Sequence, residues 1–69
     1  MSFVQKFIEI QKEYKIDGMR FEEDILDIFA TRNQETRRCT LDHGIFDERK
    51  MKIFEDWVDE NSEWLKNRN

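Results

Sequence analysis

The sequence contains no proline and only two glycines, so very little in it interrupts regular secondary structure. Both glycines, Gly18 and Gly44, lie between segments in which apolar residues recur with the spacing of an amphipathic helix. This punctuation divides the chain into three pieces. Together they predict an all-α fold, a compact three-helix bundle with helices at about residues 2–16, 19–33 and 47–67.

The first predicted helix begins with a capping box. Ser2 and Gln5 have the spacing at which a hydroxyl and a side-chain amide satisfy the free N–H groups of a first helical turn. Apolar residues from Phe3 to Tyr14 share one side of this helix, as a core-facing helix requires. Gly18 is then expected to end the segment in the left-handed conformation.

The second predicted helix covers residues 19–33. Acidic residues in its first turns suit the positive end of a helix dipole, and Arg32 suits the negative end. Residues 34–46 are interpreted as a loop, with a short β-hairpin closed at Asp42-His43-Gly44 as the alternative. The loop is favoured because either strand of such a hairpin would have only about three or four residues.

The third predicted helix begins at Asp47, which has the chemistry of an N-cap, and holds most of the candidate functional residues. Its acids share one face, where like charges four residues apart destabilise an isolated helix by roughly a few tenths of a kcal/mol per pair. Both tryptophans lie on its apolar stripe, as core residues or as anchors for a partner. Asn61 lies in the same stripe, either as a buried amide or as a sign of incomplete burial. The predicted partner-binding residues are Glu55, Asp56, Trp57, Asp59, Glu60, Glu63 and Trp64.

Length and composition restrict the classes of protein. A chain of 69 residues has room for one hydrophobic core, and we therefore predict a single domain over residues 1–69. Nine aromatic residues supply the apolar area that this core needs. The single cysteine excludes an intramolecular disulfide and favours the reducing cytoplasm. No segment approaches the roughly 18 apolar residues of a membrane span, so no membrane association is expected.

A net charge of −4 disfavours nonspecific binding to nucleic acid. Basic residues nevertheless concentrate in the segment 32–52. If that segment folds back on itself, Arg37, Arg38, Arg49 and Lys50 form one patch that can contact phosphate. The alternative function is therefore a nucleic-acid-binding protein, and a further one is an acidic mimic of nucleic acid that uses the third helix.

Residues suited to catalysis or metal binding are few. Cys39 and His43 are the only candidates for nucleophilic or metal chemistry, and a structural zinc site needs four ligands of these types. No orienting third group accompanies them, and the sequence has no glycine-rich phosphate loop. We therefore predict a protein without catalytic activity, metal or cofactor.

The function predicted from the sequence is a noncatalytic protein–protein interaction module. It would act as a small regulator or inhibitor, of the adaptor or phage-inhibitor kind, and would dock through the acidic, tryptophan-bearing third helix. The expected partner is a protein with a basic surface. A homodimer is a further prediction, since a second copy would add the buried area that so short a chain lacks.

Overall fold

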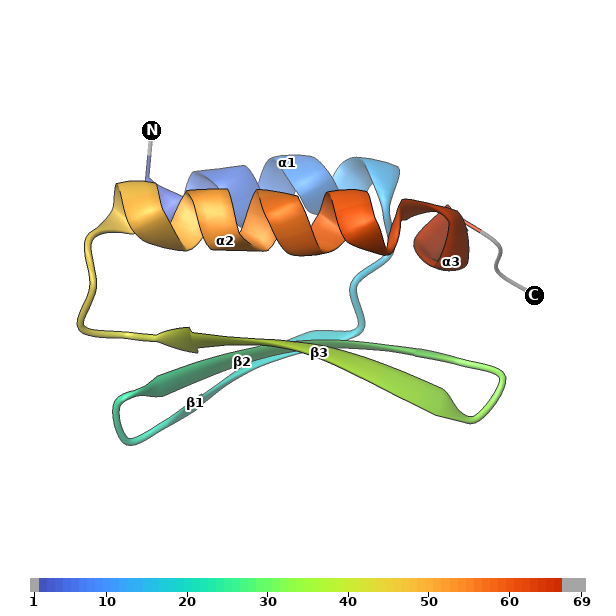
Figure 1. The fold of residues 1–69 in the computed structure, drawn as a ribbon, viewed down its shortest axis with the longest axis horizontal. Coiled ribbons are helices and arrows are strands. Elements are labelled where there is room, and N and C mark those ends of the chain that lie inside the picture. Colours follow the sequence, from blue (N-terminus) through green and yellow to red (C-terminus); the bar gives the residue numbers. More distant parts are fainter. Residues whose placement is uncertain (1, 67–69) are drawn as a thin grey trace.

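Six elements follow one another in the computed structural model, which describes residues 2–66. They are α1 (Phe3–Glu13), β1 (Gly18–Glu22), β2 (Ile25–Arg32), β3 (Glu35–Asp42), α2 (Asp47–Glu60) and α3 (Ser62–Lys66). The strands form one antiparallel sheet in the order β1-β2-β3, so β2 is central and β1 and β3 are the edges. The helices all lie on one side of this sheet, and residues 2–66 leave its other side open (Figure 1).

The fold is α+β, and the prediction of an all-α three-helix bundle is wrong. Most of residues 19–33 form the β1–β2 hairpin instead of a helix. Residues 34–46, predicted as a loop or a short hairpin, contain the single strand β3. The two outer helices exist but are shorter than predicted, since α1 ends at Glu13 and α2 at Glu60.

The error over residues 19–33 has a physical cause. In β2, Leu26, Ile28 and Ala30 are buried on the helix side of the sheet, while Phe29 lies on the opposite side. A strand with apolar residues on both sides also contains apolar pairs three and four residues apart, so a helical period fits it too. The β-branched and aromatic residues of this segment instead favour a strand.

Neither hairpin turn contains glycine. Asn33 and Gln34 connect β2 to β3 with φ angles of 51° and 71°, as a two-residue type I′ turn requires. Glu23, in the β1–β2 turn, also has a positive φ of 54°. The turn predicted at Asp42-His43-Gly44 is not a hairpin, because it connects β3 to α2, and Gly44 has no positive φ.

Gly18 has a different role from the predicted left-handed helix end. It is the first residue of β1, has no positive φ, and faces Phe29 of β2 in the sheet register. The Phe29 ring covers it so closely that an added Cβ would lie 2.5 Å from the ring Cζ. Glycine therefore fits here because an aromatic ring approaches the backbone, and not because of a turn.

The predicted capping box of α1 is confirmed. The N–H of Gln5 donates to the Ser2 hydroxyl at 3.3 Å, and the N–H of Ser2 donates to the Gln5 side-chain oxygen at 3.0 Å. These reciprocal hydrogen bonds satisfy donors that the first turn of a helix leaves free. These two hydrogen bonds at the start of α1 come from residues three positions apart, so local sequence is enough to predict them.

The predicted N-cap at Asp47 is wrong by one residue. Phe46 is the N-cap of α2 and makes no side-chain capping hydrogen bond. The Asp47 carboxylate instead accepts a hydrogen bond from the backbone N–H of Phe3 at 3.3 Å, which connects the first turns of α1 and α2. This hydrogen bond, and then that from Lys50, lowers the pKa of Asp47.

Asn61 interrupts the predicted third helix and separates α2 from α3. Its side-chain amide donates to the Trp57 carbonyl at 2.7 Å and accepts a hydrogen bond from Arg37 at 2.7 Å. Of the two interpretations of Asn61, the hydrogen-bonded amide is therefore the one observed, in a half-buried position. Residue 67, the last of the predicted helix, lies outside the described residues.

The core fills the space between the helices and the sheet. Phe54 of α2 is fully buried at its centre and contacts the rings of Phe3 and Phe7, with centroid distances of 5.8 and 5.7 Å. The strands contribute alternate residues, which brings their apolar side to the helices. The buried hydrophobic residues are Phe3, Phe7, Ile16, Leu26, Ile28, Ala30, Cys39, Leu41, Phe54, Val58 and Leu65.

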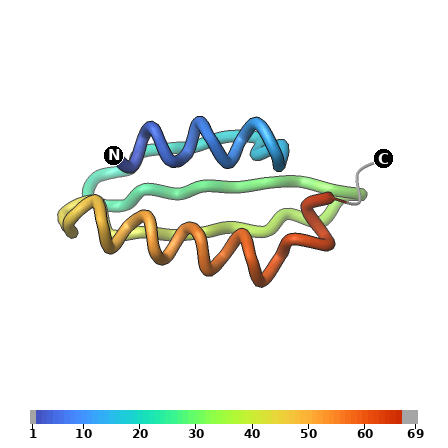
Figure 2. Tube along the Cα trace, turned by 90° about the horizontal axis from the view of Figure 1, so that it is seen from above, coloured from blue at the N-terminus to red at the C-terminus, as the bar shows by residue number. Residues whose placement is uncertain are grey.

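The two long helices lie side by side and run in the same direction. Seen from above, α1 follows the β1 side of the sheet and α2 follows the β3 side, with β2 between them (Figure 2). The candidate site is a recess lined by residues of both helices.

Candidate functional site

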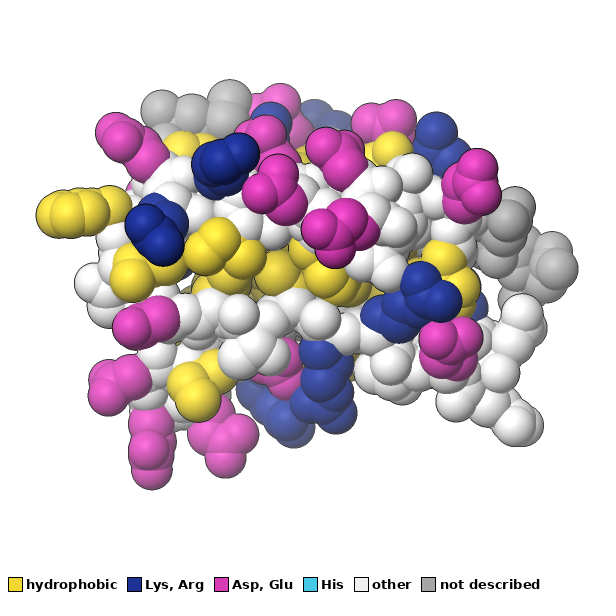
Figure 3. Space-filling model, viewed as in Figure 1, with side chains coloured by type: hydrophobic (Ala, Val, Ile, Leu, Met, Phe, Trp, Pro, Cys, Tyr) yellow, Lys and Arg dark blue, Asp and Glu magenta, His cyan; other side chains and the backbone are white. Residues whose placement is uncertain are grey.

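The acids predicted as partner-binding residues are exposed on the outer surface of the helical layer. Figure 3 shows acidic side chains spread over α2. Glu55 forms an ion pair with Lys6 of α1 at 3.2 Å, and Asp56 pairs with Lys52 at 3.8 Å. Within residues 2–66, Asp59, Glu60 and Glu63 form no ion pair. Most of the acidic face is therefore free to contact a cation from outside.

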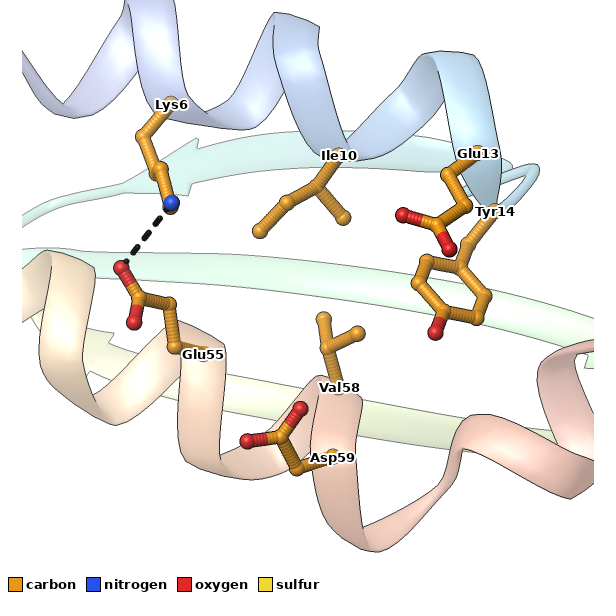
Figure 4. A pocket seen from close by; sticks show the side chains of 7 residues that line it. All are labelled: Lys6, Ile10, Glu13, Tyr14, Glu55, Val58 and Asp59. Carbon is orange, nitrogen blue, oxygen red and sulfur yellow. Dashed lines mark ion pairs between the residues drawn. The ribbon is translucent and has the colours of Figure 1, made fainter.

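Two acids of this face, Glu55 and Asp59, line a groove between α1 and α2. It is a recess of about 200 Å³, and we call it the helix groove (Figure 4). Val58 of α2 is buried and Ile10 of α1 is partly buried, so the middle of the groove is apolar. The residues that line it are Lys6, Ile10, Glu13, Tyr14, Glu55, Val58 and Asp59.

The two ends of the helix groove differ in charge. At one end the Lys6–Glu55 ion pair bridges the helices and neutralises both groups (Figure 4). Glu13 lies at the other end beside Tyr14, while Asp59 lies on α2 between that end and Glu55 (Figure 4). Glu13 and Asp59 form no ion pair within the described residues, so their negative charges are not neutralised as that of Glu55 is.

The helix groove suits a further cation chemically. Two carboxylates can accept charge-assisted hydrogen bonds from a guanidinium or ammonium group. The Tyr14 ring already has one cation near it, because Lys66 Nζ lies 5.6 Å from the ring centroid. The apolar middle formed by Ile10 and Val58 suits the aliphatic stem of a long basic side chain.

The two predicted tryptophans are half-buried and pack against the core. The Trp57 ring stacks on Phe54 at a centroid distance of 6.2 Å. The Trp64 ring lies against two guanidinium groups, with Arg37 at 4.6 Å and Arg32 at 5.7 Å from its centroid. Both rings therefore already have partners within the fold, and neither lines the helix groove.

The four basic residues of the alternative nucleic-acid site do not meet in one patch. Arg37 is on the helix side of β3, where it contacts Trp64, while Arg38 points from the open side of the sheet to Asp27. Lys50 is buried and pairs with Asp47 at 3.3 Å, and Arg49 is exposed on α2. Of these four residues, only Arg38 lies on the open face of the sheet.

Cys39 and His43 do not form a reactive pair. Cys39 is buried in the core, and His43 is exposed in the loop after β3, where its ring packs against Phe21 at 5.1 Å. Burial, and then the nearby negative charge of Asp27, raises the pKa of the Cys39 thiol to about 11. The thiol is therefore protonated at neutral pH, and a nucleophilic thiolate is not available at this position.

The groove residues of α1 were missed by reasoning from the sequence. Lys6 and Glu13 have the character of ordinary residues on the polar side of an amphipathic helix. They line one groove with Glu55 and Asp59 because α1 packs beside α2, parallel to it. The predicted bundle gave no information on which polar residues of one helix lie beside those of another.

No known protein family, curated protein or solved structure matches this chain. Within residues 2–66, no group of three or more histidine, cysteine, aspartate or glutamate residues is arranged to hold a metal ion. Helices long and apolar enough to cross a membrane are absent from the same part of the chain.

Proposed function

We propose that this chain is a noncatalytic protein-interaction domain that binds a basic segment of a partner protein on its helical layer. The helix groove is the centre of the binding surface, and the remaining exposed acids of α2 and α3 surround it. Binding there would regulate or inhibit the partner by covering its basic segment. The proposal places the protein in the cytoplasm, where its lone thiol stays reduced.

One observation carries the proposal. Glu13 and Asp59, from two different helices, line the same groove, and neither forms an ion pair among the described residues. A carboxylate without an ion-pair partner favours a cation, and a partner's guanidinium or ammonium group would supply one. The middle of the groove is apolar, which would not be expected of an acidic surface that serves only to keep the protein in solution. Arginine is the best ligand, since its planar group can bond two carboxylates at once.

The tryptophans have a supporting role in this proposal. Trp57 and Trp64 pack against the core and hold α2 and α3 in place, so we do not assign them as the anchors of the interface. The acids Glu55, Asp56, Asp59, Glu60 and Glu63 remain the proposed contact residues, and Glu13 joins them from α1.

An NMR titration with a ten-residue peptide of alternating arginine and alanine tests this function. We expect backbone amide shifts that concentrate on α1 and α2 beside the groove. The double variant Glu13→Gln/Asp59→Asn should weaken binding about tenfold, because two charge-assisted hydrogen bonds are lost. The matched control is Glu23→Gln/Asp24→Asn, which changes the net charge equally at the exposed β1–β2 turn. Equal weakening by both variants, or shifts spread over the whole surface, would rule out the groove.

A further inference from the structure

The open face of the sheet has an organised polar surface that the proposed function does not use. Each strand presents alternate residues to this side, and the sheet register brings them into rows across β1, β2 and β3. One row is Arg20, Asp27 and Thr40, the next is Gly18, Phe29 and Arg38, and the third is Thr31 with Thr36. No element within residues 2–66 covers these rows (Figure 1).

Five of these residues surround a shallow recess of about 210 Å³, which we call the sheet recess. Its lining residues are Arg20, Phe29, Thr31, Thr36 and Arg38. Two arginines therefore lie on either side of an aromatic ring, because Arg20 is on β1, Phe29 on the central strand and Arg38 on β3. Neighbouring strands are roughly 4.8 Å apart, and the two arginines are also offset by two residues, or about 6.7 Å, along the strands. Their backbones are therefore about 12 Å apart.

Arg38 is held in position by a buried carboxylate. Asp27 accepts from Arg38 Nη1 at 2.7 Å and from the Thr40 hydroxyl at 3.1 Å, and Asp27 itself is only 9% exposed. The Arg38 side chain is nevertheless 55% exposed, so the rest of its guanidinium group is open to solvent. A guanidinium group fixed on one side and free on the other loses little conformational entropy when it binds a ligand.

Arg20 and Phe29 complete the surface. Arg20 is exposed and forms no ion pair or side-chain hydrogen bond with another residue in the range 2–66. The Phe29 ring covers the backbone of Gly18 and lines the recess, so it is supported from below and reachable from above. A supported ring of this kind can stack with a planar group.

The charge of the molecule is distributed unevenly around this face. Figure 3 shows lysine and arginine side chains gathered below the middle of the sheet, with acidic side chains over the helices and near the β1–β2 turn. The acidic side chains over the helices and near that turn disfavour a polyanion, while the arginines at the middle of the open face attract one. The overall charge of −4 does not prevent such a contact, but it limits the affinity.

We propose that the sheet recess binds single-stranded nucleic acid, with one base stacked on Phe29 and phosphates paired with Arg20 and Arg38. A ring flanked by two cations matches the alternation of bases and phosphates along a strand. Unpaired bases are required, since the flat face has no helix or ribbon to enter a groove of a duplex. This site is on the opposite side of the sheet from the helix groove, so the two proposals stand or fall separately.

Fluorescence anisotropy with labelled 12-nucleotide uridine and thymidine strands tests the proposal. We expect binding at 20 mM salt that weakens about sevenfold between 50 and 200 mM, since two phosphates on a single strand give a slope of about −1.4. The duplex of the same length should bind much more weakly. Absence of binding at 20 mM salt, or equal affinity for the duplex, would overturn the proposal.

Three variants assign the binding to the recess. Arg20→Gln removes a side chain without internal partners and should lower the salt slope by about 0.7. Phe29→Leu keeps an apolar side chain at this position but removes the stacking ring, and should weaken binding about fivefold. Arg49→Gln, an equal change of charge on exposed α2, is the matched control and should have no effect.

A competing acidic peptide separates nucleic acid from other anions. Poly-glutamate has the charge of the strand but no base to stack. If it displaces the strand at equal charge concentration, and Phe29→Leu binds as well as the unaltered protein, the recess is a general anion patch and the proposal is wrong. Resistance to displacement together with the loss in Phe29→Leu supports a stacked base.

Discussion

The two sides of the β-sheet are built from the same three strands and differ in every other respect. The side under the helices contains Leu26, Ile28 and Leu41, none of them more than 2% exposed. The open side contains threonines, arginines and one buried carboxylate, Asp27, whose partners are side chains of the next strand. Neighbouring residues of a strand point to opposite sides of the sheet. A residue that stabilises the fold is therefore followed by one that is available to a ligand.

This difference shows how a small domain divides its residues between stability and binding. The covered side has to supply most of the buried apolar area, because a chain of 69 residues has little of it. The open side contributes less to stability and can keep exposed arginines. Substitutions on the two sides should accordingly differ in size, and the following predictions test that from the largest expected effect to the smallest.

Phe54→Ala should destabilise the protein most. The ring is fully buried and contacts Phe3, Phe7 and Trp57, so its removal leaves a cavity under the helices. We expect a loss of about 3 to 5 kcal/mol in the free energy of unfolding, measured by urea denaturation. Phe46→Ala is the control, since that ring is 86% exposed and should cost less than about 0.5 kcal/mol. Equal losses would mean that the covered side is not the core.

The stability of the covered side should depend on alkaline pH through Cys39. Its pKa is about 11 in the folded protein and 9.0 in the absence of burial. Between these values the unfolded chain loses the thiol proton and the folded protein keeps it, so stability falls as pH rises from 9 to 11. The loss should be about 2 kcal/mol in total.

Urea denaturation at several alkaline pH values measures this effect. Cys39→Ala removes the titrating thiol. The difference between this variant and the unaltered protein in the slope of unfolding free energy against pH is therefore due to the thiol, and not to tyrosine or lysine. Identical slopes for the two proteins would contradict the burial of Cys39.

Asp27→Asn should have a smaller effect, although Asp27 is buried. The amide keeps the shape and can still accept from Thr40, but the charge-assisted bond to Arg38 becomes a weaker neutral one. We expect a loss of about 1 kcal/mol by denaturant titration. Glu22→Gln, an exposed acid on the edge strand, is the control and should be neutral. A loss of unfolding free energy as large as that of Phe54→Ala would contradict the expectation that the open side contributes less to stability than the covered side.

Gly18→Ala should have an effect no larger than that of Asp27→Asn. The new Cβ would come within 2.5 Å of the Phe29 ring, which has to move, at a cost of about 1 kcal/mol. In a Phe29→Leu background the same substitution should cost less or stabilise the chain, because Gly18 has no positive φ and the open face leaves space. A double-mutant cycle by urea denaturation measures this coupling, and additive effects would show that the ring does not cover Gly18.

Features encoded by neighbouring residues could be predicted from the sequence. The capping box of Ser2 and Gln5 needs only a spacing of three residues, and it was predicted correctly. The predicted start of α2 at Asp47 agrees with the structure, but its N-cap is Phe46, because the Asp47 carboxylate accepts from Phe3 of α1 instead of capping its own helix. That hydrogen bond joins residues 44 positions apart, and no local pattern indicates it.

The sheet was not predictable in the same way. Its two turns use Glu23-Asp24 and Asn33-Gln34, which lack the glycine that usually marks a hairpin, so the apolar residues between them matched a helical period. Residues that come together only through packing or strand pairing could not be found from the sequence. Asp59 was identified from its own helix, while Glu13 and Arg20 became site residues only through the packing of α1 and the pairing of β1.

The position of β1 and β3 at the two edges of the sheet has a consequence for handling the protein. Among the described residues each pairs with β2 alone, which leaves backbone donors and acceptors open to strand addition by another molecule. Charged side chains on the edge strands disfavour such addition. They include Arg20 and Glu22 on β1 and Glu35, Arg37 and Arg38 on β3. Substitutions that remove several of these charges together should therefore promote aggregation through intermolecular strand pairing. Single substitutions by glutamine avoid this, so a change in binding can be measured without a change in aggregation.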